Sequence, residues 1–85
     1  MSAVVDNSRT ARFELQEQGE LAWASYHVEG STLFIDDVFS PPALRGQGTA
    51  GRLMAGVVEA ATGKSQKIVP ICGYAATWLA RHNRM

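Results

Sequence analysis

The sequence has little cysteine, no excess of charge and no long apolar run. Its one cysteine, Cys72, cannot form an internal disulfide, and with two separated histidines it does not suggest a metal site. Eight basic and eight acidic residues cancel, so no basic stripe attracts nucleic acid or anionic lipid. No run is long enough to cross a bilayer or to act as a signal peptide. We therefore expect a soluble cytoplasmic protein with no metal, nucleic-acid or membrane partner.

What is present indicates one small folded domain. The chain has 85 residues, of which 46% are hydrophobic, a share too high for a disordered segment. A chain of this length supports a single modest core. We expect one domain over residues 1–85, with residues 1–8 forming a loose or weakly paired N-terminus.

Strand-like alternation of apolar and polar residues dominates the first half of the chain. It extends over residues 12–18, 20–28 and 32–39. Gly19 and Gly30 mark short turns between the runs, which predicts an antiparallel meander. In the third run, strict alternation places Leu33, Ile35 and Asp37 on one face, so Asp37 is expected to be partly buried.

The period then changes from two residues to that of a helix. Apolar residues follow at helical offsets, namely Ala50, Leu53, Met54, Val57, Val58 and Ala61. Thr49 is placed to cap the start of this helix and Gly63 to end it. Residues 67–71 read as a buried strand and residues 73–82 as a last helix. That helix is expected to bury Ala75, Leu79 and part of Trp78.

The expected order is β-β-β-α-β-α. A strand–helix–strand connection in one sheet is right-handed and makes its two strands parallel. The predicted fold class is therefore α/β in the α+β sense, with a mixed, mostly antiparallel sheet that contains one parallel pair.

A glycine-rich segment precedes the first helix. Gly46, Gly48 and Gly51 spell G-x-G-x-x-G, and free amides at a helix start favour a phosphate group. A nucleoside-triphosphate loop needs Lys and then Ser or Thr after the last glycine. Here Arg52 and Leu53 follow, and Leu53 lies on the apolar face of the helix, so this interpretation is rejected.

A dinucleotide site fits no better. It needs the first glycine close to the strand end and an acidic residue about 20 positions on. Pro41 and Pro42 separate the strand from the glycines, and residues 67–72 contain no carboxylate. A tight turn with no ligand remains an alternative.

The segment fits a third pattern when Arg45 is included. Arg45, Gly48 and Ala50 match [Q/R]-x-x-G-x-[G/A], which resembles the acetyl-coenzyme A motif of the GNAT acyltransferase superfamily. The stretch "VFSPPALRGQG" and the predicted element order are also similar to that superfamily, over roughly residues 9–82. A P-x-C-x-Y stretch resembles its small branch of about a hundred residues, here as Pro70, Cys72 and Tyr74.

The resemblance implies a binding site for coenzyme A between splayed parallel strands. It implies that strand-end backbone pairs with pantetheine at Val38, Phe39 and Ser40. It implies that loop amides hold the pyrophosphate at Arg45, Gly46, Gln47, Gly48, Thr49 and Ala50. Gly51 and Arg52 would extend that contact, or Arg52 is a solvated helix residue.

Three residues are candidates for catalysis. Cys72, at a helix start, would be a thiolate nucleophile or acyl carrier, or a small buried hydrophobe. Asp37 stands near the point where the small branch often has a histidine, and would be a general base or a structural partner. Tyr74 would protonate the departing thiolate or pack against the sheet. His27 and His82 are expected to be structural.

The sequence thus predicts an acyl-CoA-dependent N-acyltransferase. It would transfer acetyl from acetyl-CoA, its co-substrate, to a primary amine on a small molecule or peptide. A non-catalytic CoA-binding or acyl-sensing module is the main alternative, and a purely structural domain is the third. The small core also allows a homodimer.

Overall fold

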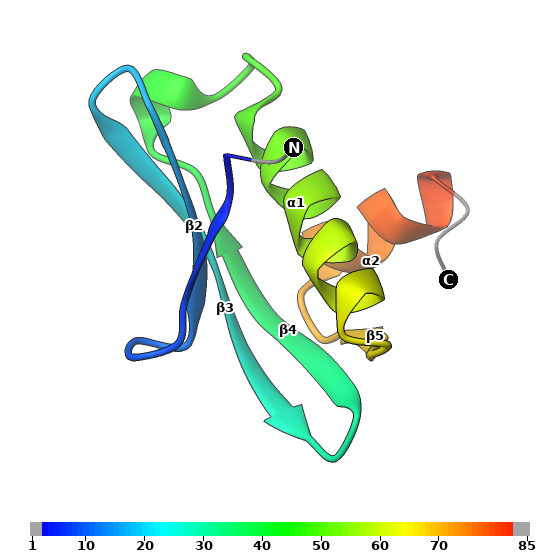
Figure 1. Ribbon diagram of the computed structural model, residues 1–85. Coiled ribbons are helices and arrows are strands. Elements are labelled where there is room, and N and C mark those ends of the chain that lie inside the picture. The colour runs from blue at the N-terminus through cyan, green and yellow to red at the C-terminus, as the bar shows by residue number, and fades with distance from the viewer. Residues whose placement is uncertain (1–2, 83–85) are drawn as a thin grey trace.

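The computed structural model describes residues 3–82, and these form one sheet with two helices beside it (Figure 1). The strands are β1 (Val5–Asn7), β2 (Arg12–Glu17), β3 (Glu20–Glu29), β4 (Thr32–Phe39) and β5 (Lys67–Pro70). The two helices are α1 (Thr49–Gly63) and α2 (Gly73–Arg81), and a short 3-10 turn, η1 (Pro42–Leu44), precedes α1.

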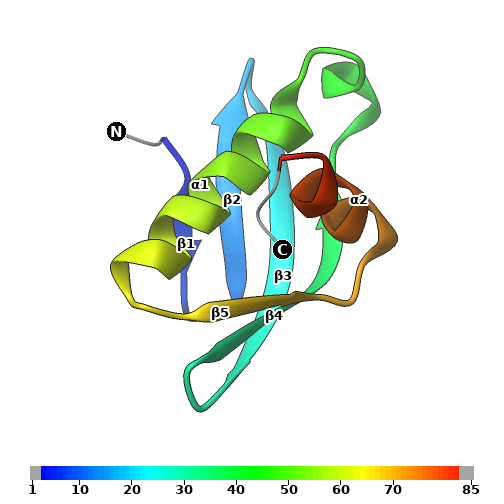
Figure 2. The same cartoon turned by 90° about the vertical axis from the view of Figure 1, so that its right-hand side faces the viewer.

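The five strands lie in the order β1-β2-β3-β4-β5. All neighbours are antiparallel except β4 and β5, which α1 connects as a parallel pair. Figure 2 shows α1 and α2 on the same face of this sheet. The predicted α+β class, with a mostly antiparallel sheet and one parallel pair, is confirmed.

The N-terminus, expected to be loose or weakly paired over residues 1–8, is paired at β1. Val5–Asn7 pairs with β2, and its Asp6 carboxylate accepts a hydrogen bond from Tyr26 Oη at 2.5 Å and lies 3.2 Å from Lys64 Nζ. The sequence did not indicate this strand, because three residues are too few for a periodic pattern and the partners of Asp6 are 20 and 58 positions away. Residues 1–2 of the expected loose end lie outside the described residues.

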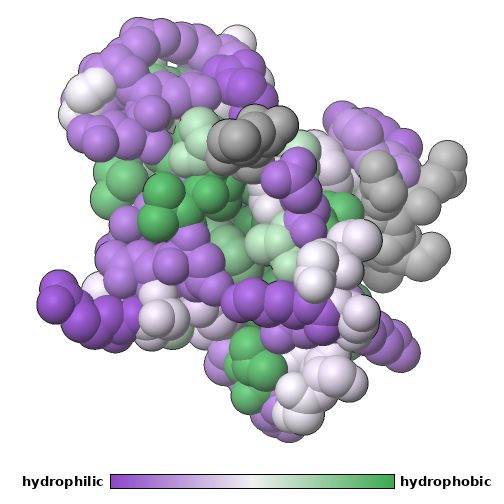
Figure 3. All heavy atoms as spheres, viewed as in Figure 1, coloured by the Kyte–Doolittle hydropathy of each residue, from purple (hydrophilic) through white to green (hydrophobic). Residues whose placement is uncertain are grey.

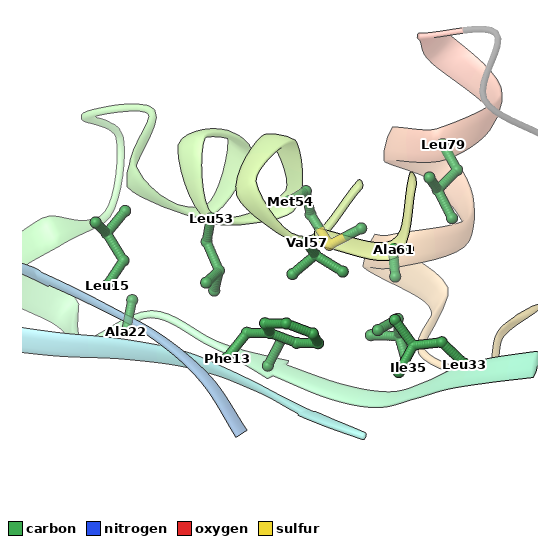
Figure 4. Packing of buried hydrophobic residues seen from close by; sticks show 12 residues of the cluster. Phe13, Leu15, Ala22, Leu33, Ile35, Leu53, Met54, Val57, Ala61 and Leu79 are labelled. Atoms are coloured by element: carbon green, nitrogen blue, oxygen red, sulfur yellow. The ribbon is translucent and has the colours of Figure 1, made fainter. Parts of the chain in front are cut away.

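The core lies between the sheet and the helices, and Figure 4 shows its side chains meeting there. From α1 the buried members are Leu53, Met54, Val57 and Ala61, as the helical period predicted, and from α2 they are Ala75 and Leu79. Ala50 and Val58 are half-buried instead, because they lie at the edge of the helix face. The space-filling view, taken from the direction of Figure 1, shows hydrophobic residues mainly near and to the left of the centre, with hydrophilic residues around them (Figure 3).

A β-bulge in β4 changes which side chains face the core. Tyr26 lies opposite Ile35 and Ser25 lies opposite Asp37, so Asp36 is an extra residue in β4. The alternation is reset after it: Val38 packs against the core and Asp37 is exposed. The prediction that Asp37 shares a buried face is therefore wrong.

The start of α1 and the end of β5 also differ from their predictions. Gly48, not Thr49, is the N-cap of α1, with no side-chain capping bond, and Thr49 is the first helical residue. Gly63 is the last residue of α1, as predicted. β5 ends at Pro70, and Ile71 is 60% exposed. β5 is half-buried because it is the edge strand of the sheet.

Truncating a core residue of α1 tests this packing. Leu53 is fully buried, so Leu53→Ala is expected to lower the free energy of unfolding by about 2–5 kcal/mol in urea titrations. Leu21→Ala, at a residue 39% exposed on β3, serves as the control and is expected to cost roughly 0.5 kcal/mol or less. Equal losses for the two variants would contradict the packing described here.

Candidate functional site

The parallel strands separate at Ile35. Its carbonyl accepts the N–H of Ile71 at 2.9 Å and that of Cys72 at 3.1 Å, and the parallel register ends with Ile35 opposite Pro70. β4 continues to Phe39, while the chain after β5 turns away into α2. The predicted splay of the parallel pair is therefore present, and it leaves one edge of β4 without a strand partner in the described structure.

A groove of about 410 Å³ opens at this separation. It is lined by Val38, Phe39, Ser40, Leu44, Arg45, Gly46, Gly48, Thr49, Ala50, Gly51 and Tyr74. The structure thus brings together the end of β4, the segment before α1 and the first turn of α2. Nine of the ten residues that the resemblance assigns to coenzyme A are in this set, and Gln47 is the exception.

Leu44 lines the groove although the sequence did not single it out. It is buried, and its N–H donates to the Pro41 carbonyl at 2.9 Å within the turn η1. The signal for it was its position as an apolar residue between two prolines and a glycine segment. Leu44 gives the groove part of its apolar wall.

The glycine loop, residues 45–51, presents unpaired amides to the groove. The first backbone bond of α1 runs from Arg52 N–H to the Gly48 carbonyl at 3.0 Å. The N–H groups of Thr49, Ala50 and Gly51 precede it and have no acceptor inside the helix. Together with the helix dipole they form a site suited to an anion.

Two glycines have backbone angles that a side chain would strain. Gly46 has φ 80° and Gly48 has φ 79°, both in the left-handed region. A Cβ on Gly48 would also lie 3.1 Å from Arg52 Nη1, whereas one on Gly46 would meet open space. Arg45 Nε donates to the Ser40 carbonyl at 3.1 Å, which ties the loop to the end of β4.

A carboxylate on the neighbouring hairpin holds the loop in this conformation. Glu17 Oε1 accepts from Thr49 Oγ1 at 2.6 Å, and both Glu17 oxygens accept from Arg52 at 2.8 Å. These bonds, first those from Arg52 and then that from Thr49, lower the pKa of Glu17 to about 2. Gln18 Nε2 donates to Gln47 Oε1 at 2.6 Å, which adds a second link.

Sequence reasoning missed Glu17 because its partners are 32 and 35 positions away. Arg52 is an exposed residue of α1, as one of its two expectations has it, and its guanidinium also binds Glu17 and donates to the Gln47 carbonyl at 3.0 Å. It is therefore a support of the loop. It is not among the residues that line the groove.

Of the three catalytic candidates, Tyr74 alone lines the groove. It is 43% exposed. Partial burial raises the pKa of Tyr74; the Arg81 charge opposes this, and the nearby Cys72 adds to it. Cys72 is the half-buried N-cap of α2, packs against the core and is not a lining residue. Asp37 is exposed, and its Oδ1 accepts the Val38 N–H at 3.0 Å.

The histidines make structural contacts. His27 Nδ1 lies 2.8 Å from Asp36 Oδ2, and the His82 ring stacks on Trp78. Within residues 3–82 no three His, Cys, Asp or Glu side chains gather as metal ligands would. None of the helices in that range is long and apolar enough to span a membrane.

The Glu17 network predicts a specific pH dependence. Because its pKa is lowered in the folded state, Glu17 contributes stability above its usual pKa of 4.5 that is lost as the pH falls toward about 2. Glu17→Gln is expected to be less stable than wild type at pH 6, and this difference should shrink below pH 4.5. Urea titrations over this range measure it. A difference that is constant with pH, or one matched by Glu20→Gln in the same hairpin, would contradict the network.

No curated protein matches this chain. The sequence model of the GCN5-related N-acetyl-transferase family matches residues 12–85, which include every strand from β2 onward, both helices and the groove. The mixed sheet with its splayed parallel pair is consistent with this match. The chain therefore belongs to the GCN5-related N-acetyl-transferase family.

Proposed function

We propose that the protein transfers an acetyl group from acetyl-CoA to a primary amine on a small molecule or peptide. The observation that carries this proposal is the continuous groove from the open edge of β4 to the amides at the start of α1. Membership of the family supports acyl transfer in general. The choice of acetyl-CoA and of a primary amine is the further step proposed here.

The glycine loop is suited to the pyrophosphate. The amides of Thr49, Ala50 and Gly51 precede the first helical bond, and the left-handed glycines keep side chains from covering them. Because Glu17 and Arg52 hold the loop in place, little ordering is needed when an anion binds. The pantetheine arm would then lie along β4 at Val38, Phe39 and Ser40.

Bound acetyl-CoA supplies the acyl group as a thioester; the amine nitrogen bonds to its carbonyl carbon as the C–S bond breaks. Two proton transfers remain for the protein. Tyr74 is suited to donate to the leaving sulfur, since it lines the groove and a phenol is protonated at neutral pH. Asp37, which precedes the lining residue Val38 on β4, would accept the proton of the amine.

Cys72 has a different position. It packs against the core and does not line the groove. We therefore propose that the amine attacks the thioester directly, without an acyl-cysteine intermediate. One observation favours the alternative of a non-catalytic acyl-CoA sensor: the Asp37 carboxylate is engaged by a backbone amide in this structure. A sensor would bind coenzyme A through the same loop without turnover.

Binding tests the loop. In calorimetric titrations with acetyl-CoA, Gly46→Glu is expected to weaken binding about 10- to 100-fold, because it places a carboxylate beside the pyrophosphate. Gly30→Glu is the matched control, since Gly30 also has a positive φ of 62° and open space but lies in the β3–β4 turn. Absence of binding by folded wild type would refute both the enzyme and the sensor.

Turnover tests the chemistry. With an excess of an amine panel, Tyr74→Phe is expected to lower kcat about 100-fold or more, with little change in KM for acetyl-CoA. Cys72→Ala is expected to retain turnover. Release of coenzyme A, followed with a thiol reagent, measures both. Binding without turnover in wild type would favour the sensor, and loss of turnover in folded Cys72→Ala would point to an acyl-cysteine.

A further inference from the structure

The amide of Val38 faces the open edge of β4. Ile35 directs its carbonyl toward the β5 side, where it accepts the N–H groups of the two residues that follow β5. Ile35 lies opposite Tyr26, and Val38 lies opposite Ala24, two residues away on β3. Main-chain groups point to alternate sides along a strand, so Tyr26 and Ala24, two residues apart on β3, point to the same side. Their partners on β4 do the same, because the bulge adds one residue between them. Val38 therefore presents its N–H on the same side as Ile35. There β5 has turned away and Val38 lines the groove.

The acceptor for this amide is a neighbouring side chain. Val38 N–H donates to Asp37 Oδ1 at 3.0 Å. Hydrogen bonds to a carboxylate are roughly twice as strong as bonds between neutral groups. Asp37 is exposed, so its side chain can rotate away without disturbing the sheet. Because the amide has one hydrogen, another strong acceptor can bind it only by replacing the Asp37 carboxylate.

We propose that the Asp37 carboxylate is a built-in cap on the Val38 amide, which an acyl thioester must displace and which coenzyme A without an acyl group leaves in place. This rests on the proposed function, because it assumes that the thioester carbonyl reaches the open edge of β4. Because the thioester carbonyl must displace this hydrogen bond, the acyl group adds little to the affinity for coenzyme A. The Asp37 carboxylate is released from the Val38 amide only when an acyl group has bound.

A pair of ligands isolates this effect. S-Ethyl-CoA has nearly the size of acetyl-CoA but no carbonyl, so the ratio of the two dissociation constants reports the carbonyl alone. In wild type the two are expected to bind about equally. In Asp37→Ala, acetyl-CoA is expected to bind about 2- to 10-fold more tightly than S-ethyl-CoA, the range of one net hydrogen bond.

Asp36→Ala is the matched control. It removes a carboxylate from the same bulge, but that carboxylate contacts His27 rather than Val38. Its ratio of dissociation constants is expected to equal that of wild type. A general gain in affinity from the loss of negative charge affects both ligands and cancels in the ratio.

The outcomes separate the cap from the function. If both ligands bind wild type and the ratio is unchanged in Asp37→Ala, the cap is refuted and the proposed function stands. If neither ligand binds wild type, the proposed function fails and the cap fails with it. Should Asp37→Ala not fold, hydrogen exchange of free wild type decides, since the capped Val38 amide is expected to exchange more slowly than its intrinsic rate. Exchange at the intrinsic rate would overturn the proposal.

Discussion

The carbonyl of Ile35 is the point on which the geometry of the site depends. It accepts the N–H groups of both Ile71 and Cys72, so the chain leaves β5 there and turns into α2. This turn brings Tyr74 to the groove and exposes the far half of β4. Because Ile35 is fully buried in the sheet, the core fixes the opening and the surface loops do not.

The second requirement is a loop that holds its shape before a ligand arrives. Gly46 and Gly48 lose much conformational freedom when they are fixed in the left-handed region. Glu17 offsets this cost, since it ties the end of β2 to Thr49 and Arg52 in the first turn of α1. One carboxylate outside the groove thus keeps the amides directed into it, which is the arrangement expected for tight anion binding.

Periodicity predicted most of the fold, and the resemblance that the glycine motif carries predicted most of the lining of the groove. The helical offsets of Leu53 and Val57 and the glycines of the loop are local features, so they are visible in the sequence. The contacts of Glu17 and the pairing of β1 depend on distant residues and are not visible. The clearest missed signal was Asp37 itself, a carboxylate at a position that strict alternation assigned to the core. The catalytic roles of Asp37, Cys72 and Tyr74 stay predictions.

The bulge at Asp36 follows from the cost of burying charge. Without the extra residue, Asp37 would share the buried face of Leu33 and Ile35, and Val38 would face outward. Burying an unpaired carboxylate is far more costly than exposing one valine. The sequence Asp-Asp-Val therefore selects the bulge, since it returns Val38 to the core and leaves Asp37 in solvent. The same shift turns the Val38 amide to the open edge of β4, so the packing of the core itself creates the polar group of the groove.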